Sequence, residues 1–194
     1  MKKKKTAKDK KEYLIFGERL GIRRLRPTDA TPIYLGWLND FQVQAYTRRR
    51  GRNVSSKEMK DFLVAAQRSL DWHLALVVRD GRKHIGNLSL NSIDAKNKSA
   101  ELSIMIGDRS VWGQGYATEA IELAADFAFR ALKLHRLWAE SPNSAFNAVM
   151  EKIGWIHEGK RRQAFLAGKK FLDFECWSLL HDEWRVRHNR GAVK

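Results

Sequence analysis

The hydrophobic and polar positions of this chain follow two periods, and the shorter period predicts strands. Residues 12–26 hold two short apolar runs on either side of a turn at Gly17, ahead of Pro27, and we expect two short strands there. Three longer runs are rich in apolar and β-branched residues and are separated by turn-like sequences: 72–80, 83–94 and 99–108. Short turns join neighbouring strands into hairpins, so these runs predict an antiparallel meander.

The longer period predicts helices in two segments. Residues 55–70 begin with Ser55 and Glu58 at the spacing of a capping box, ahead of apolar residues three and four positions apart. Residues 117–134, which follow the meander, repeat the same apolar spacing. Both segments are therefore expected to form amphipathic helices.

A shorter helix is predicted at residues 30–40. Thr28 or Asp29 is its expected N-cap, because either side chain can accept a hydrogen bond from the first turn. Pro32 must then lie in the first turn, where its missing N–H breaks no helical hydrogen bond.

The order of these elements predicts one mixed domain. Strands and helices alternate through 194 residues, 43% of them apolar, which is enough for one hydrophobic core. We expect a single α/β (α+β) domain at residues 12–186. Residues 1–11 carry seven lysines and almost no apolar side chain, which predicts a disordered basic tail, and residues 187–194 predict a short basic tail at the other end.

Composition argues against several classes of protein. No run approaches the roughly 18 consecutive apolar residues of a membrane helix, and no secretory signal is visible, so we expect a cytoplasmic protein without a membrane span. The single cysteine, Cys176, has no internal disulfide partner, and its apolar surroundings favour a small buried strand residue over a nucleophile. The histidines lack metal-ligand spacing, so no metal is expected.

The positive charge of the chain makes an acidic binding partner a candidate. The formal net charge is +15, and arginines concentrate at residues 48–52, in a predicted loop where guanidinium groups are suited to phosphate. Nucleic acid or a ribosome is one candidate, but no zinc finger, RNA-binding strand signature or helix-turn-helix pattern accompanies the charge. A solvated basic surface and an anion-binding surface are therefore both open interpretations.

The stretch RSVWGQGYATEA, residues 109–120, joins the last strand of the meander to the helix after it. Gly113 and Gly115 allow a ligand to approach the backbone, and the first N–H groups of a helix have no intrahelical acceptor. With the helix dipole, this arrangement favours a pyrophosphate, and a glycine-eased turn without a ligand is the alternative. The stretch is neither a P-loop, which ends in Gly-Lys-Ser/Thr, nor a dinucleotide fingerprint, which follows a parallel βαβ strand.

This stretch and its neighbours resemble the GNAT N-acetyltransferases. The similar branch contains ribosomal-protein N-terminal acetyltransferases and nucleotide-amino-sugar acetyltransferases. The matching pieces stand in family order: RLRPTDATPIYLGWLND, HIGNLSL, AELSIMIGD, WGQGYATEA, LHRLWAESPNSAFNAVMEKIGWIHEGKRRQ and GKKFLDFECWSLLHDEW. The resemblance covers residues 19–184 and implies the GNAT acyl-CoA N-acyltransferase fold, with a mixed, mostly antiparallel central sheet flanked by helices and splayed at the acetyl-CoA site.

The resemblance implies acetyl-CoA as cosubstrate. The residues expected to hold its pyrophosphate through backbone N–H groups are Trp112, Gly113, Gln114, Gly115, Tyr116, Ala117 and Thr118. Trp112 stands where the family has Arg or Gln, so the loop is expected to bind through its backbone. The pantetheine arm is expected to pair like an added strand with the backbone of Ile104, Met105 and Ile106.

The family pattern also places an asparagine and a serine near the start of a later helix. Asn143 matches the asparagine that binds the pantetheine amide, with a helix cap as its alternative role, and Lys152 matches a lysine near the end of the pattern. Phe146 occupies the serine position, and Met150 the position where other branches have tyrosine. Neither side chain can reprotonate a departing thiolate, so the sequence assigns no general acid.

Acetyl transfer needs a base for the amine proton. Glu101 is the catalytic candidate, because strand alternation places it on the face of Ser99 and Ser103. A carboxylate on a polar strand face without a catalytic role is the alternative. Three histidines are weaker candidates for the same role: His73, His84 and His157.

Three functions from different classes follow. The resemblance favours an acetyl-CoA-dependent N-acetyltransferase, and the alternatives are a non-catalytic acetyl-CoA-binding module and a ribosome- or RNA-associated basic protein. The acceptor of the enzyme is expected to be a nucleotide amino sugar or similar small amine, or a protein N-terminus, selected by residues 34–52. Polyamines are disfavoured because so basic a chain repels cations. The oligomeric state is expected to be a monomer or a homodimer.

Overall fold

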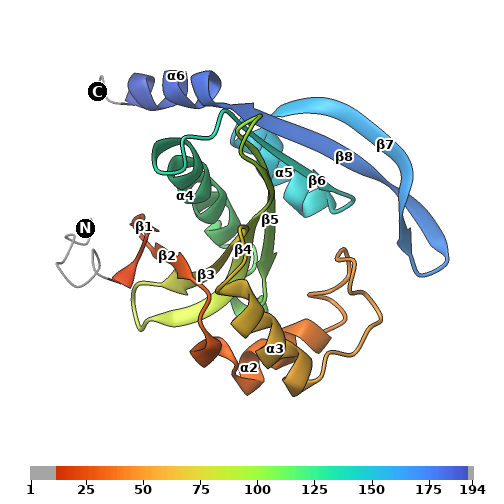
Figure 1. Cartoon of the computed structure of the whole chain (residues 1–194). Helices are drawn as coiled ribbons and strands as arrows, with labels where there is room; N and C mark the ends of the chain where they lie inside the picture. The colour runs from red at the N-terminus through yellow and green to blue at the C-terminus, as the bar shows by residue number, and fades with distance from the viewer. Residues whose placement is uncertain (1–11, 192–194) are drawn as a thin grey trace. The chain divides into compact units, whose positions relative to one another are not determined.

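The computed structural model describes residues 12–191. The predicted tail at 1–11 and the last three residues of the one at 187–194 lie outside the described residues. Two compact units are present, one of residues 12–90 and 103–124 and the other of residues 91–102 and 125–191. Figure 1 shows the elements of each unit, and the last helix, α6 (His181–Gly191), runs through residue 187. The single domain at 12–186 stays a prediction.

The first unit is built on the antiparallel meander that the sequence predicts. Its strands pair in chain order, each antiparallel to the next: β1 (Ile15–Phe16), β2 (Leu20–Arg24), β3 (Trp72–Val78) and β4 (Lys83–Asp94), whose residues 91–94 belong to the second unit. The end of β5 (Ser99–Ile106) also belongs to this unit. The predicted strand runs are therefore confirmed.

Helical segments connect and follow these strands: η1 (Pro27–Asp29), α2 (Pro32–Asn39), α3 (Ser56–Ala66), η2 (Arg109–Val111) and the first turns of α4 (Tyr116–Arg130). The start of α3 is the predicted capping box. The Ser55 hydroxyl accepts the Glu58 N–H at 3.1 Å, and the Glu58 carboxylate accepts the Ser55 N–H at 2.8 Å. This helix start therefore satisfies its own donors.

The start of α2 differs from the prediction. Thr31 is the N-cap, and its hydroxyl accepts the N–H of the third helical residue at 3.2 Å, while Pro32 occupies the first helical position as expected. Asp29 is instead buried in η1, where it forms two hydrogen bonds of 2.8 Å to the guanidinium of Arg23. The expected cap at Thr28 or Asp29 is wrong because this ion pair fixes Asp29 away from the helix.

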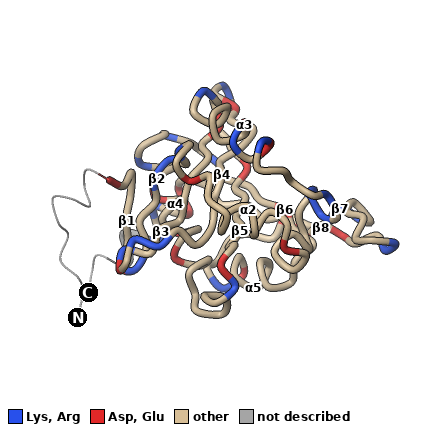
Figure 2. The backbone as a smooth tube through the Cα atoms, turned by 90° about the horizontal axis from the view of Figure 1, so that it is seen from below, with Lys and Arg blue, Asp and Glu red and all other residues tan. Residues whose placement is uncertain are grey.

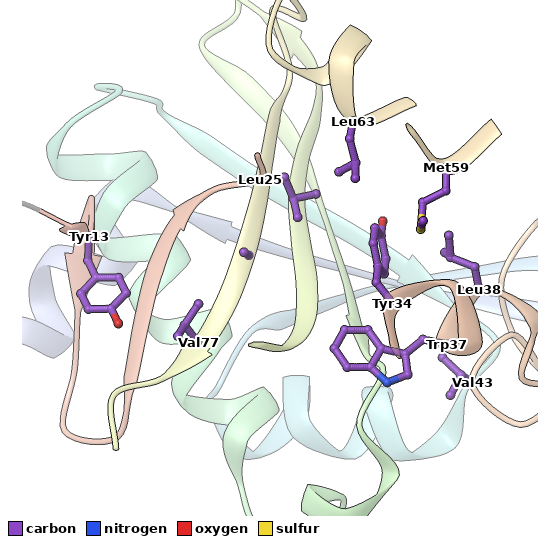
Figure 3. Close-up of a cluster of buried hydrophobic side chains, with 10 residues drawn as sticks. Tyr13, Leu25, Tyr34, Trp37, Leu38, Val43, Met59, Leu63 and Val77 are labelled. Atoms are coloured by element: carbon purple, nitrogen blue, oxygen red, sulfur yellow. The ribbon is translucent and has the colours of Figure 1, made fainter. Parts of the chain in front are cut away.

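A hydrophobic cluster holds α2 and α3 against one face of β3 (Figure 3). Its buried members come from these three elements and from the segments beside them: Tyr13, Leu25, Tyr34, Trp37, Leu38, Val43, Met59, Leu63, Ala75 and Val77. Met59 and Leu63 lie on the apolar stripe that the sequence predicts for α3. Because both helices are packed on the same strand, the segment between them, residues 40–55, has fixed ends.

The second unit contains the remaining elements: the start of β5, the end of α4, β6 (Arg136–Ser141), α5 (Ser144–Lys152), β7 (Ile156–Ala167), β8 (Lys170–Leu180) and α6. Its strand order is β5-β6-β8-β7. The β5–β6 pair is parallel and covers Ser99 to Glu101, whereas the other two pairs are antiparallel. The expected fold class, a mostly antiparallel mixed sheet flanked by helices, is confirmed.

The end of α4 lies four residues before the predicted one. The helix stops at Arg130, and the Leu132 N–H donates to the Phe127 carbonyl at 3.2 Å in the turn that follows. Lys133 then adopts φ of 56°, in the left-handed region that commonly ends helices. The prediction misses this end because no glycine or proline marks it.

Strand β7 is the outer strand of the second unit, and most of its residues are exposed. Lys160, Arg161 and Arg162 follow one another along it, and Figure 2 shows Lys and Arg at several places on the β7–β8 hairpin, including its tip. The register with β8 shifts twice, and Gly159 and Gln163 have positive φ at these shifts.

Candidate functional site

The glycine loop, residues 112–118, leads directly into α4 in the first unit. Gly113 and Gly115 have φ of 74° and 78°, which favour glycine, and a Cβ at Gly113 would meet nothing within 4 Å. In the described part of the chain, five consecutive or nearly consecutive amides donate to no backbone oxygen: those of Gly113, Gly115, Tyr116, Ala117 and Thr118. These donors, at the positive end of a helix, suit a pyrophosphate.

Long side chains hold the shape of the glycine loop. Trp112, whose side chain is 43% exposed, donates its indole Nε1–H to the Ile106 carbonyl at 2.9 Å and so ties the loop to the end of β5. The Gln114 side chain donates from Nε2 to the Ser110 carbonyl at 2.8 Å. With these two side chains engaged, the backbone amides of the loop remain as donors.

The end of β5 is fixed by its neighbours. Ile104, Met105 and Ile106 are half-buried. A Cβ on Gly86 of β4 would lie 2.3 Å from the Met105 carbonyl oxygen, so the two strands approach closely only because this residue is glycine. The side-chain amide of the buried Gln44 lies 3.4 Å from the Met105 sulfur. Pairing of this backbone with a pantetheine arm stays a prediction.

Two side chains that the sequence analysis did not single out hold the start of α4. Glu119 Oε1 accepts the backbone N–H groups of Arg19 at 2.8 Å and Leu20 at 3.0 Å, and its Oε2 accepts Arg19 Nε–H at 2.8 Å. Arg19 NH1 donates to the Gln114 carbonyl at 2.7 Å, and its guanidinium carbon lies 4.4 Å from the centre of the Tyr116 ring. An acidic residue in a first helical turn is ordinary, so no sequence signal marks this pair.

In the second unit, the predicted acetyl-CoA residues belong to α5 and its cap. Asn143 is the N-cap, with Oδ1 accepting the Ala145 N–H at 3.0 Å, so the alternative role foreseen for it is confirmed and its binding role stays a prediction. Phe146 is half-buried, and Lys152 is exposed in the last turn. Met150 is completely buried. As the sequence predicts, neither Phe146 nor Met150 supplies a proton donor where the family pattern has one.

Glu101 lies in the β5 segment of the second unit. Its neighbours Ala100 and Leu102 are buried, while Glu101 itself is partly exposed, so its side chain projects from the strand face that alternation predicts. Its backbone pairs with Trp138 of β6. This placement fits a base and a plain polar residue equally well, and the catalytic role stays a prediction.

Two of the three candidate histidines lie in the first unit. His84 Nε2 lies 2.9 Å from the Asn87 side-chain oxygen, and burial lowers the pKa of this histidine. His73 Nδ1 lies 3.2 Å from the Ser89 hydroxyl, and burial lowers its pKa as well. Both rings are therefore neutral near pH 7, since each pKa lies below the ordinary value of 6.5.

The remaining reactive side chains lie on the β7–β8 hairpin. His157 Nε2 lies 2.6 Å from a Glu175 carboxylate oxygen. Cys176 lies in a strand, β8, as expected, but it is half-buried where a buried side chain was expected. Burial raises the pKa of its thiol, which keeps it protonated. Among the described residues, no group of three or more His, Cys, Asp or Glu side chains is arranged to hold a metal ion.

The arginine-rich segment, residues 40–55, connects α2 and α3 without regular structure. Arg52 forms an ion pair of 2.8 Å with the first turn of α3. The guanidinium groups of Arg49 and Arg50 lie over aromatic rings at 5.4 and 4.8 Å, and Arg50 also donates to a backbone carbonyl at 2.8 Å. These partners are uncharged, so they do not neutralise Arg49 or Arg50.

Comparison with known proteins identifies the family. The model of the family described as Acetyltransferase (GNAT) domain matches residues 19–156, more than half of the chain. The matched range includes the glycine loop, the end of β5 and Asn143. Of the helices in the described residues, none has the length and apolar character needed to cross a membrane.

Individual proteins agree with this match. Uncharacterized N-acetyltransferase p20 of Bacillus licheniformis is 27% identical over 175 residues, covering 88% of this chain and 97% of that protein. Putative ribosomal N-acetyltransferase YdaF of Bacillus subtilis is 34% identical over 101 residues, covering 51% and 55%. A spermidine N-acetyltransferase from Vibrio cholerae, crystallised with CoA and spermine, has the same fold, with a TM-score of 0.79 at 20% identity over 87% of this chain and 99% of that one. The chain therefore belongs to the GNAT family and is an N-acetyltransferase.

Proposed function

We propose that this enzyme moves the acetyl group of acetyl-CoA to the primary amine of a small acceptor that also carries phosphate, such as a nucleotide-linked amino sugar. Acetyl-CoA is the cosubstrate of this family, and this chain shares it. The observation that carries the choice of acceptor is the positive charge of Arg49 and Arg50, which their aromatic and backbone partners leave uncompensated.

The acetyl donor, acetyl-CoA, is proposed to bind at the glycine loop and at the end of β5. The amides of Gly113 and Gly115 and those of the first turn of α4 bind the pyrophosphate, because a phosphate oxygen there meets both N–H donors and the positive end of the helix dipole. The backbone of Ile104, Met105 and Ile106 pairs with the pantetheine arm. Three further residues belong to the proposed cofactor-binding set on the strength of the family resemblance: Asn143, Phe146 and Lys152.

The reaction forms a C–N bond and breaks a C–S bond. The neutral amine attacks the thioester carbonyl, the CoA sulfur leaves with the bonding electron pair as a thiolate, and the amine nitrogen gives up one proton. Glu101 takes this proton, directly or through a water molecule. Phe146 and Met150 cannot protonate the thiolate, but a thiolate leaves readily near neutral pH without a proton donor.

The charges of the arginine-rich segment support a phosphate-bearing acceptor. Its single acidic residue, Asp40, accepts the N–H of Gln42 at 2.7 Å and has Arg109 at 3.5 Å. Its carboxylate is therefore engaged within the protein, whereas Arg49 and Arg50 present guanidinium forks that match a phosphate group. A polyamine would meet repulsion here. The spermidine N-acetyltransferase is 20% identical to this chain, and a likeness at that level shows the fold alone.

An acceptor panel tests the proposal on the full chain. Release of the CoA thiol is measured with a UDP-linked amino sugar, the same amino sugar without its nucleotide, a peptide with a free N-terminus, and spermidine. We expect the highest kcat/KM with the UDP-linked amino sugar and a loss of about tenfold or more without the nucleotide, since charged hydrogen bonds contribute ~1.5–3 kcal/mol each. A higher kcat/KM with spermidine or the peptide would overturn the phosphate-bearing acceptor and leave the acetyltransferase activity standing.

The variant Arg49→Met tests whether the uncompensated charge of this arginine binds the acceptor. It is expected to lower kcat/KM for the UDP-linked sugar about tenfold, with little change for the sugar without phosphate. Lys57→Met is the matched control, because it removes one positive charge from α3 where Lys57 is already paired with Asp61 at 2.7 Å. Equal losses in both variants would point to overall charge and contradict a specific role for Arg49.

Glu101→Gln examines the chemical step. The substitution keeps the shape of the side chain and removes its basicity, so kcat is expected to fall about 10²-fold or more while the Kd for CoA stays unchanged. Phe146→Ser, which restores the family residue, is expected to change the rate less because thiolate departure is not limiting. A pH–rate profile of Glu101→Gln that matches the parent would remove Glu101 from the mechanism.

A further inference from the structure

Arg19 connects three parts of the first unit. It lies in the turn between β1 and β2, beside α4 (Figure 1), and each of two guanidinium nitrogens has a fixed acceptor. Nε donates to the Glu119 carboxylate at 2.8 Å, and NH1 donates to the Gln114 carbonyl at 2.7 Å. The face of the guanidinium stacks on Tyr116, with 4.4 Å between its carbon and the ring centre. These contacts hold the guanidinium plane in one orientation.

Glu119 directs the arginine and leaves the helix start open. Its side chain is 16% exposed, and its two oxygens accept three N–H groups, all from Arg19 and Leu20. A glutamate in a first helical turn commonly folds back to cap its own helix. Here the carboxylate is engaged with β2 instead, so it does not compete for the amides of Tyr116, Ala117 and Thr118.

The third nitrogen of Arg19 lies beside the glycine loop. NH2 is 3.6 Å from the point where a Cβ on Gly115 would stand. In the described part of the chain, NH2 has no hydrogen-bond acceptor, unlike Nε and NH1. A guanidinium that is held by two of its nitrogens and keeps a third for solvent is preorganised for an anion, since little side-chain entropy is then lost on binding.

We propose that Arg19 binds acetyl-CoA. Its Nε and NH1 are held by Glu119 and by the Gln114 carbonyl, and its NH2 donates a hydrogen bond to a phosphate oxygen of acetyl-CoA. This assignment rests on the proposed placement of the pyrophosphate at the glycine loop. It adds a charged side chain to a site otherwise built from neutral amides, in a chain that has Trp112 where the family pattern has Arg or Gln.

The test measures CoA binding by titration calorimetry and steady-state kinetics on the full chain. Arg19→Met is expected to raise the Kd for CoA and the KM for acetyl-CoA about 10-fold to 100-fold, because a charged hydrogen bond contributes ~1.5–3 kcal/mol, with kcat nearly unchanged. Kinetics with S-acetylpantetheine, which has no phosphate, are expected to match the parent. Arg24→Met is the control, since Arg24 lies on β2 and stacks on Trp72 at 3.9 Å.

Salt dependence separates a direct contact from a purely structural one. A charge that meets phosphate makes binding weaken as salt rises, so the slope of log Kd against log salt is expected to be smaller in Arg19→Met than in the parent and in Arg24→Met. An unchanged slope, or an equal loss with S-acetylpantetheine, would make Arg19 a support of the loop and overturn the proposal. CoA binding abolished by Gly115→Val but unaffected by Arg19→Met would overturn it and leave the proposed function intact. Failure of the parent to bind CoA would overturn both.

Discussion

Helices α3 and α4 both begin near a glutamate, and the two glutamates are used in opposite ways. At α3, Glu58 folds back onto the N–H of its own cap, Ser55, and the Ser55 hydroxyl accepts the Glu58 N–H in return. At α4, Glu119 faces away from its helix and binds the backbone of Arg19 and Leu20. The start of α3 satisfies donors with its own cap, whereas the amides of Tyr116, Ala117 and Thr118 at the start of α4 have no backbone acceptor among the described residues.

The proposed binding site at α4 depends on this difference. Every helix begins with amides that lack an intrahelical acceptor, and a cap normally satisfies some of them. The start of α4 has glycines in place of a capping side chain, and the carboxylate of Glu119 in its first turn is bound to Arg19. Variants at the start of either helix therefore test the proposed site directly.

Gly115→Val is expected to have the largest effect. A β-branched residue at φ of 78° is strained and covers the loop amides, so the Kd for CoA should rise at least 100-fold by calorimetry. Gly51→Val is the matched control, because Gly51 has φ of 75° with nothing within 4 Å of an added Cβ, and it lies outside the glycine loop. Both variants should lose ~1–2 kcal/mol of stability from backbone strain. Unchanged CoA affinity in folded Gly115→Val would refute the placement of the pyrophosphate.

The two glutamates can be compared by the same isosteric change. Glu119→Gln loses the charged hydrogen bond to Arg19 and frees the side chain to approach the loop amides, so the Kd for CoA should rise about tenfold. Glu58→Gln should leave the Kd for CoA unchanged while lowering the melting temperature. If both variants bind CoA like the parent, the orientation of Glu119 has no part in keeping the helix start open.

Ser55→Ala is expected to affect stability alone. Removing the cap of α3 should lower the free energy of unfolding by ~1 kcal/mol, as measured by urea denaturation. The Kd for CoA and the kcat should be those of the parent, because this helix start has no ligand role. A weakened CoA complex would show that α3 and the glycine loop are energetically coupled.

The smallest effect concerns acid stability. Hydrogen bonds from the Ser55 backbone and side chain, with a contribution from Arg52, lower the pKa of Glu58 from its ordinary 4.5 to about 2. A carboxyl with a lowered folded-state pKa stabilises the fold above its unfolded pKa, and this stabilisation is lost as the pH falls through the folded value. The melting-temperature difference between the parent and Glu58→Gln should therefore shrink between about pH 4.5 and pH 2. A difference that stays constant over this range would contradict the capping interaction.

Features defined by neighbouring residues were predictable from the sequence. The capping box of α3 lies within four residues, and the meander follows from alternation and short turns, so both are confirmed. The cap of α2 was not predictable, because the partner of Asp29 is Arg23 on a strand. Nothing local distinguishes an aspartate that caps a helix from one that forms a buried ion pair.

The candidate site also has parts that were predictable from neighbouring residues and parts that were not. The glycine loop follows from Gly113 and Gly115 at a strand-to-helix junction, which is a local pattern. Arg19 is 95 residues from the Gln114 carbonyl that it binds, and only the folded chain brings the two together. Whether the charges of Arg49 and Arg50 are paired also depends on folding, because the sequence gives four arginines within residues 48–52 without saying which of them meets a carboxylate.

The outer strand β7 has a consequence for the concentrated protein. A long, exposed strand edge is a template on which another molecule can add a strand, and this is a common route to aggregation. Here Lys160, Arg161 and Arg162 place three consecutive positive charges along the strand, and two register shifts make its pairing with β8 irregular. Any intermolecular sheet formed along β7 would have to strip water from these three cations, so self-association through this edge is disfavoured even where Leu166 remains exposed.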